Sequence, residues 1–145
     1  MIKYVRDEYI TLDEYLDFLR RSNLGNRYPK ERYQERVSHL LENRSISITA
    51  RDQDNLLVGI CFGLTDFTYF LFISDLGVDR NYQKMGIGKE LIRIIQNEAG
   101  GEDDITVVTV ANGNATEFYE KSGYTNDINT LWWKPCRVWT QRNAE

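Results

Sequence analysis

The sequence predicts one α/β (α+β) domain built on a mixed β-sheet with helices on both faces. Its 145 residues, 41% of them apolar, are enough for a single domain with one hydrophobic core. Segments with strand and helix periodicity alternate without a linker. In the centre a strand, a helix and a strand follow one another, which requires a crossover and makes parallel strands. We therefore expect residues 1–145 to form one domain with a mostly antiparallel sheet and a parallel central pair.

The first elements are a short strand and a helix. Ile2–Val5 is rich in residues that favour strands. Thr11 is the expected N-cap of the first helix, because Glu14 three residues later completes a capping-box pattern. The polar stretch Asn23–Asn26, which contains a glycine, ends this helix.

A second helix and three strands follow. Pro29 suits the first position of the helix, which runs to about Asn43. In Ile46–Ala50 apolar and polar residues alternate, which predicts a half-buried strand. Leu56–Leu64 is the next strand. Tyr69–Val78 is apolar on both faces at its start, so we expect it inside the sheet.

The second half of the chain continues the alternation. A helix is expected from Gly86 to about Ala99, followed by two glycines that end it. The β-branched stretch Ile105–Ala111 is then a strand. A short helix over Asn114–Ser122 stops at a glycine, and Leu131–Val138 is the last strand.

The composition narrows the class of protein. A net charge of −4 argues against general binding to nucleic acid or to an anionic membrane. The chain contains no apolar run long enough for a membrane span, and its first residues lack the apolar core of a signal peptide. Cys61 and Cys136 are too few for a disulfide scaffold or a zinc cluster. We expect a soluble cytoplasmic protein without a metal.

A glycine-containing turn joins the apolar strand Tyr69–Val78 to the following helix. Its two glycines allow close approach of a ligand to the backbone, and the helix N-terminus favours an anion, so the turn predicts a phosphate site. A Walker A loop is excluded because Glu90 stands where Ser or Thr is required. A Rossmann fingerprint is excluded because Leu91 replaces its third glycine. The turn consists of Gln83, Lys84, Met85, Gly86, Ile87, Gly88 and Lys89.

The pattern Q-x-x-G-x-G in this turn resembles the pyrophosphate loop of the GNAT-type N-acetyltransferase superfamily. The segment from Asn112 to Tyr124, with the sequence NGNATEFYEKSGY, is similar to a second motif of that family. The residues DLGV at Asp75–Val78 match the family's D-L-x-V before the loop. The resemblance covers about Leu56 to Trp133.

The resemblance implies transfer of an acetyl group from acetyl-CoA to an amine. It implies that the backbone N–H of Val78 stabilises the charge on the carbonyl oxygen and that the backbone of Leu76 pairs with pantetheine. Tyr119 stands where the family carries its general acid, although its ring could also simply pack. The cofactor contacts implied are Leu76, Gly77, Val78, the seven residues of the turn, Asn112, Asn114, Phe118 and Tyr119.

The general base is left open by the sequence. Where several relatives carry glutamate this chain has Ser74, which could hold a water, and Asp75 is the nearest carboxylate. Strand alternation places the two side chains on opposite faces, so only one easily reaches the substrate. A direct base and a water relay are both retained.

Two rival functions are also considered. A non-catalytic acyl-CoA sensor would keep the turn but lack turnover, and the serine at position 74 favours it. A nucleotide-dependent kinase or dehydrogenase is disfavoured by the two failed phosphate motifs. The acceptor is expected to be a small-molecule or peptide amine, with no nucleic-acid or membrane partner. Trp132 and Trp133 in the last strand suggest a homodimer.

Overall fold

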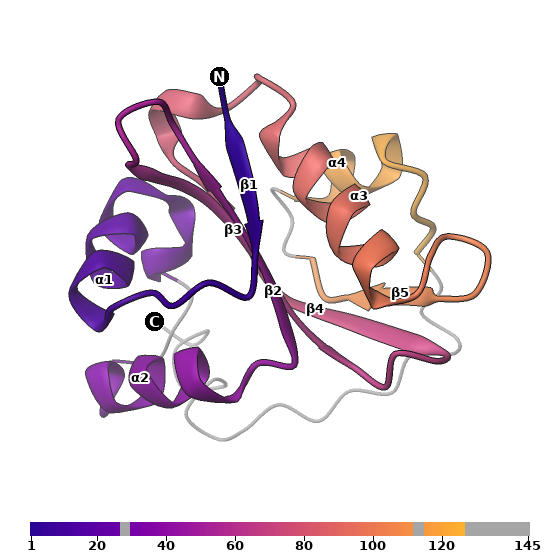
Figure 1. Cartoon of the computed structure of the whole chain (residues 1–145), viewed down its shortest axis with the longest axis horizontal. Helices are drawn as coiled ribbons and strands as arrows, with labels where there is room; N and C mark the ends of the chain where they lie inside the picture. Colours follow the sequence, from indigo (N-terminus) through magenta and orange to yellow (C-terminus); the bar gives the residue numbers. More distant parts are fainter. Residues whose placement is uncertain (27–29, 112–114, 127–145) are drawn as a thin grey trace.

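The computed structural model describes residues 1–26, 30–111 and 115–126. Five strands form one sheet in the order β1-β2-β3-β4-β5, in which β4 and β5 are parallel and the other neighbours antiparallel. Figure 1 shows α1 and α2 on one face of this sheet and α3 and α4 on the other. The predicted mixed sheet with a parallel pair and helices on both faces is confirmed. So is the place of β4 inside the sheet.

The described elements follow the predicted order. The strands are β1 (Lys3–Arg6), β2 (Ile46–Arg51), β3 (Leu57–Thr65), β4 (Phe70–Val78) and β5 (Thr106–Thr109). The helices are α1 (Leu12–Arg21), α2 (Tyr33–Asn43), α3 (Ile87–Ala99) and α4 (Thr116–Lys121), with the short 3-10 turns η1 (Asn23–Asn26) and η2 (Arg80–Tyr82). No described helix has both the length and the apolar character that crossing a membrane requires.

The N-cap of α1 is confirmed, but the capping box is not reciprocal. The hydroxyl of Thr11 accepts a hydrogen bond from the backbone N–H of Glu14 at 3.1 Å. The carboxylate of Glu14, which in a capping box would accept from the N-cap backbone, instead accepts two hydrogen bonds from Arg51 on β2. The side chain of Glu14 therefore connects α1 to the sheet and does not close a local capping box.

The second helix ends at Asn43 as predicted but begins later than expected. Its first residue is Tyr33, because Arg32 takes a left-handed conformation with φ of +52° that the helix cannot include. Pro29 lies outside the described residues, so its expected position at a helix start stays a prediction.

The expected half-buried character of β2 is wrong. All six residues from Ile46 to Arg51 are buried. Two of the three polar side chains on the second face have partners: Thr49 donates to the carboxylate of Glu8, and Arg51 binds Glu8 and Glu14. Alternation in the sequence therefore marks two chemically different buried faces, not one buried and one exposed.

Each face of the sheet has its own core. The core beneath α3 is formed by buried side chains of the sheet and of α3 itself, among them Ile46, Ile48, Cys61, Leu71, Ile73, Leu91 and Ile95. The core beneath α1 is formed by buried side chains of α1, α2 and the sheet, among them Tyr15, Phe18, Leu19, Val37, Ile60 and Phe62. The predicted last strand, with Trp132, Trp133 and the proposed dimer contact, lies outside the described residues.

Candidate functional site

The edge of β4 becomes free halfway along the strand. Pairing with β3 runs from Phe62↔Asp75 directly to Gly63↔Ile73, so Ser74 is an extra residue in β4. Pairing with β5 ends at Ile73↔Thr109, whereas β4 continues to Val78. In the described part of the chain, the last five residues of β4 therefore have no β5 partner. A ligand that carries amides could pair with this stretch as an added strand.

The N-terminus of α3 is open. Gly86 is its N-cap with φ of +82°, and no side chain among the described residues caps the helix. A Cβ built on Gly86 would meet nothing within 4 Å. The first N–H groups of a helix have no partner within it and carry partial positive charge. Together these features make the predicted turn suitable for an anion such as a pyrophosphate.

Three separately predicted parts meet at Gly88. A Cβ at this position would stand 3.4 Å from the ring of Phe118 on α4 and 3.7 Å from the side chain of Val78 at the end of β4. The turn, the free end of β4 and the C-terminal motif therefore lie side by side. Nothing in the chain order alone requires this contact.

The aromatic residue expected to act as acid lies in a cluster on α4. The ring of Tyr119 meets Phe118 edge-on at 5.2 Å and Tyr124 at 5.4 Å between centroids. Burial raises the pKa of Tyr124 to about 12, with Cys61 and Tyr119 adding to the effect. Tyr124 follows Gly123, whose φ of +89° ends the helix. Sequence analysis gave no role to Tyr124, although it closes the second motif.

The carboxylate of Asp75 is only 3% exposed. Its cross-strand partner is Phe62 of the core beneath α1, whereas the partner of Leu76 is Cys61 of the core beneath α3. Asp75 and Leu76 therefore face opposite sides of the sheet. The hydroxyl of Ser74 donates to the Phe62 carbonyl at 3.3 Å. Because Ser74 is the extra residue, simple alternation does not decide which face it takes.

The basic residues around the turn differ in how they are held. Arg80 donates to the carbonyls of Arg20 and Ser22, and Arg93 pairs with Glu90. Lys84 and Lys89 are exposed, as are Gln83 and Met85 of the same turn. Arg80 and Arg93 are thus held by protein groups, while Lys84 and Lys89 are available to an anion. Asn112 and Asn114 lie outside the described residues.

Sequence analysis missed Asp79, the residue after the free strand end. It is 2% exposed, forms an ion pair with Arg21 of α1 and accepts the N–H of Asn81 at 2.8 Å. The Asp-x-Asn spacing directly after a strand is a signal for such a turn and could have identified it. Asp79 fixes the strand end from which the turn begins.

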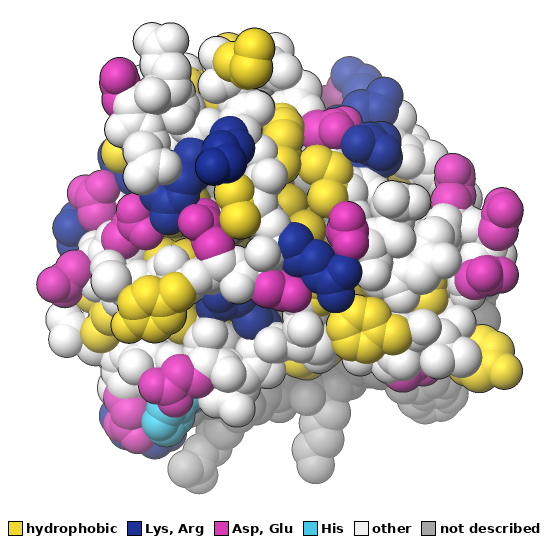
Figure 2. Space-filling model, in the orientation of Figure 1, with side chains coloured by type: hydrophobic (Ala, Val, Ile, Leu, Met, Phe, Trp, Pro, Cys, Tyr) yellow, Lys and Arg dark blue, Asp and Glu magenta, His cyan; other side chains and the backbone are white. Residues whose placement is uncertain are grey.

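Other candidate groups are excluded or distant. Burial, followed by the charge of Asp75, raises the pKa of the Cys61 thiol, so it is no nucleophile. His39 is exposed on α2. Across the described ranges, no group of three His, Cys, Asp or Glu side chains could hold a metal ion. On the face seen in Figure 2, acidic and basic side chains are interspersed.

Comparison with known proteins adds three findings. A model of the acetyltransferase (GNAT) family matches residues 11–124. An uncharacterized N-acetyltransferase of Pyropia yezoensis is 25% identical over 107 residues, which are 70% of this chain and 62% of that protein. The chain thus spans less than two thirds of that relative.

Solved structures share the fold. A probable acetyltransferase of meticillin-resistant Staphylococcus aureus has a TM-score of 0.74 at 21% identity, with 94% of this chain and 99% of that chain covered. An aminoglycoside N-acetyltransferase in complex with CoA has a TM-score of 0.66 at 14% identity, with 93% and 95% covered.

Proposed function

The chain belongs to the acetyltransferase (GNAT) family, and we propose that it is an N-acetyltransferase that moves the acetyl group of acetyl-CoA to an amine in a ternary complex. The observation that carries the proposal is the meeting of Gly88, Val78 and Phe118. It joins an anion site, a free strand edge and the helix of Tyr119 within one site. These are the parts that a phosphate-bearing, amide-bearing acyl donor needs.

The residues present fit acetyl-CoA. The open N–H groups at the start of α3, with Lys84 and Lys89 beside them, would hold the pyrophosphate. The backbone of Leu76 on the free stretch of β4 would pair with pantetheine. When bound, acetyl-CoA supplies a thioester carbonyl that an amine can attack.

We assign two protein groups to the transfer itself. The backbone N–H of Val78 donates to the carbonyl oxygen and stabilises the negative charge that develops there. The hydroxyl of Tyr119 gives a proton to the leaving sulfur. Two contacts support these assignments: the side chain of Val78 lies next to Gly88 of the turn, and the ring of Tyr119 packs against Phe118, which itself lies next to Gly88.

The attacking amine must first lose a proton. An alkylamine with a pKa near 10.4 is neutral in only about one molecule in 2,500 at pH 7. The candidates for removing the proton are Asp75 directly and a water held by Ser74. The variant Asp75→Asn separates them: loss of about 100-fold in kcat/KM assigns the base to Asp75, and near-normal activity assigns it to the water path.

The acceptor class is an amine. The fold is shared with an aminoglycoside N-acetyltransferase, so aminoglycosides belong in the first panel, beside polyamines, amino acids and peptides. Thiol release from acetyl-CoA would be measured with each. Release that depends on an amine supports the proposal.

A binding measurement forms the control. CoA bound only by the native state adds about 2.7 kcal/mol of stability at 100 times its Kd, which a thermal melt resolves. CoA binding without thiol release for any amine would identify a non-catalytic acyl-CoA module. Absence of a shift with CoA, or a shift with ATP or NAD alone, would refute the proposal.

A further inference from the structure

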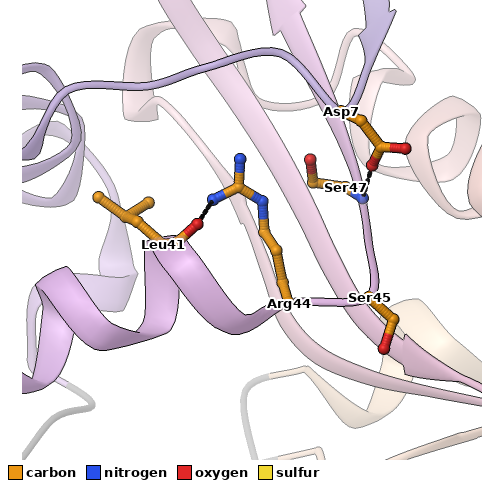
Figure 3. Close-up of a pocket in the computed structure, with 5 residues that line it drawn as sticks. All are labelled: Asp7, Leu41, Arg44, Ser45 and Ser47. Carbon is orange, nitrogen blue, oxygen red and sulfur yellow. Dashed lines mark hydrogen bonds between the residues drawn. The ribbon is translucent and has the colours of Figure 1, made fainter.

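A small polar cavity lies on the opposite side of the sheet from α3. Its volume is about 190 Å³. It is formed where β1 ends, where α2 ends and where β2 begins, and four of its five lining residues are polar (Figure 3). The lining residues are Asp7, Leu41, Arg44, Ser45 and Ser47. A cavity this small suits a ligand of a few heavy atoms.

The cation of this cavity is only partly satisfied. The guanidinium of Arg44 donates to the carbonyl of Leu41 at 2.6 Å and to that of Glu8 at 3.0 Å, and it lies 4.7 Å over the ring of Phe62. Arginine has five N–H donors, so three remain. Within the described residues Arg44 forms no ion pair with a carboxylate. Burial lowers its pKa, an effect that the charges of Asp7, Tyr15 and Glu8 oppose.

The floor of the cavity holds an unsatisfied hydroxyl. Ser47 is fully buried, and its Oγ has no hydrogen-bond partner in the described structure. Its backbone N–H donates to the Asp7 carboxylate at 2.8 Å, and its hydroxyl points to the side on which the Arg44 head lies (Figure 3). Buried hydroxyls without a partner are uncommon and call for an explanation. The two unsatisfied groups, both donors, face the same small space.

We propose that this cavity binds a small organic monocarboxylate, held by the guanidinium of Arg44 and the hydroxyl of Ser47. Donors from arginine match the geometry of a carboxylate. The charge balance favours one negative charge: among the residues that line the cavity Arg44 is the one cation, and the nearby carboxylates of Asp7 and Glu8 already bind Arg6 and Arg51. A dianion such as phosphate would be repelled by those two acids.

This site is separate from the proposed transfer site. Ser47 pairs with Phe62, and Phe62 pairs with Asp75 on the next strand. The backbones of Ser47 and Asp75 are thus about 10 Å apart, which is two strand spacings. The fully buried ring of Phe62 stands between them. The carboxylate is therefore a ligand of its own, and the proposal does not depend on acetyl transfer.

The test is a titration of the full chain with acetate, formate and inorganic phosphate, followed by amide NMR. It compares wild type with Ser47→Ala, which removes only an unpartnered hydroxyl and should leave the fold intact. The matched control is Ser22→Ala, another buried serine, whose hydroxyl bonds Leu19 and Leu24 outside the cavity. Arg44→Lys keeps the positive charge but removes the planar set of N–H donors that can bind both oxygens of a carboxylate.

We expect saturable shifts around residues 45–47 with acetate or formate in wild type and Ser22→Ala. Binding should weaken about tenfold or more in Ser47→Ala and Arg44→Lys. A wild type without saturable binding would mean that the cavity holds only water and would overturn the proposal. Equal binding by Ser47→Ala, or tighter binding of phosphate, would do the same. The affinity for acetate or formate should be the same when the titration is repeated with CoA present. Failure of CoA to bind would count against the proposed acetyl transfer and not against the carboxylate site.

Discussion

Gly88 lies against the ring of Phe118, so that a Cβ at position 88 would stand 3.4 Å from two ring carbons. A Cβ at this distance would make ordinary van der Waals contact with the ring, so α4 packs closely against the N-terminal turn of α3 at this point. The second glycine of the turn therefore has a packing role toward α4. The first, Gly86, faces open space instead. Gly88 thus contacts α4 and Gly86 faces the side from which a ligand would approach, so the two positions can be tested separately.

The first prediction concerns Gly86→Ala, with Gly101→Ala as its control. Both glycines have positive φ, +82° and +108°, and neither would place a Cβ within 4 Å of another atom in the part of the chain that the structure describes. Each alanine should therefore cost about 1 kcal/mol of unfolding free energy from the strained backbone. Only Gly86→Ala should weaken CoA binding, by tenfold or more, because only Gly86 opens the α3 N-terminus. Titration calorimetry and urea denaturation measure both quantities, and equal CoA affinity in the two variants would contradict the assignment.

The second prediction concerns the ion pairs that join β2 to α1. The side chain of Arg51 is 8% exposed and binds both Glu8 and Glu14. Arg51→Ala should destabilise the protein by about 3 kcal/mol, because two carboxylates lose their common partner. Arg93→Ala removes an exposed pair with Glu90 and should cost less than about 0.5 kcal/mol. Similar losses in urea denaturation of the two variants would be evidence against this view.

The third prediction follows from the pKa of Glu14. Hydrogen bonds from Arg51 lower it below its ordinary value of 4.5, while burial opposes them. A carboxyl with a lowered pKa in the folded state stabilises the protein above the ordinary pKa, and that stability is lost as the pH falls through the folded value. Glu14→Gln should therefore be less stable than wild type at pH 7, and the difference should shrink below about pH 4.5. A difference that stays constant between pH 7 and pH 3 would contradict the shift.

The order of elements was predictable because its signals are local. Thr11 caps a helix three residues from its partner, and Gly86 and Gly123 take positive φ where a helix begins or ends. Each of these depends on a few neighbouring residues. The candidate site residues came from the family motifs in the same way, as short strings with fixed spacing.

What the sequence could not show depends on pairing between distant segments. The extra residue at Ser74 exists only in the register of β4 against β3. The burial of Thr49 depends on Glu8, which lies 41 positions away. The cavity that holds Arg44 and Ser47 likewise forms only when Asp7, which lies 40 positions from Ser47, packs against the start of β2. Alternating polar residues in β2 therefore suggested an exposed face that does not exist.

The last prediction compares Tyr119→Phe with Tyr124→Phe. The two tyrosines meet edge-on at 5.4 Å, and both are half-buried, so each substitution removes one hydroxyl from the same aromatic cluster. If Tyr119 protonates the leaving thiolate, its loss should lower kcat by about 100- to 1,000-fold, or roughly 3–4 kcal/mol of transition-state stabilisation. KM for acetyl-CoA should change only a few-fold, because the interaction forms mainly in the transition state. Tyr124→Phe should keep kcat within a few-fold, since its phenol, with a pKa of about 12, is partly buried against the core beneath α3 and is given no role in proton transfer.

The comparison requires an amine for which chemistry limits the rate, which pre-steady-state thiol release establishes. Near-normal kcat in Tyr119→Phe would show that water supplies the proton, since a CoA thiol is itself fairly acidic. A large rise in the Kd for CoA with little change in kcat would show that Tyr119 holds the cofactor instead. An equal fall in both variants would show that the two hydroxyls contribute alike and that Tyr119 is not the sole proton donor, because each substitution keeps its ring and removes only the hydroxyl.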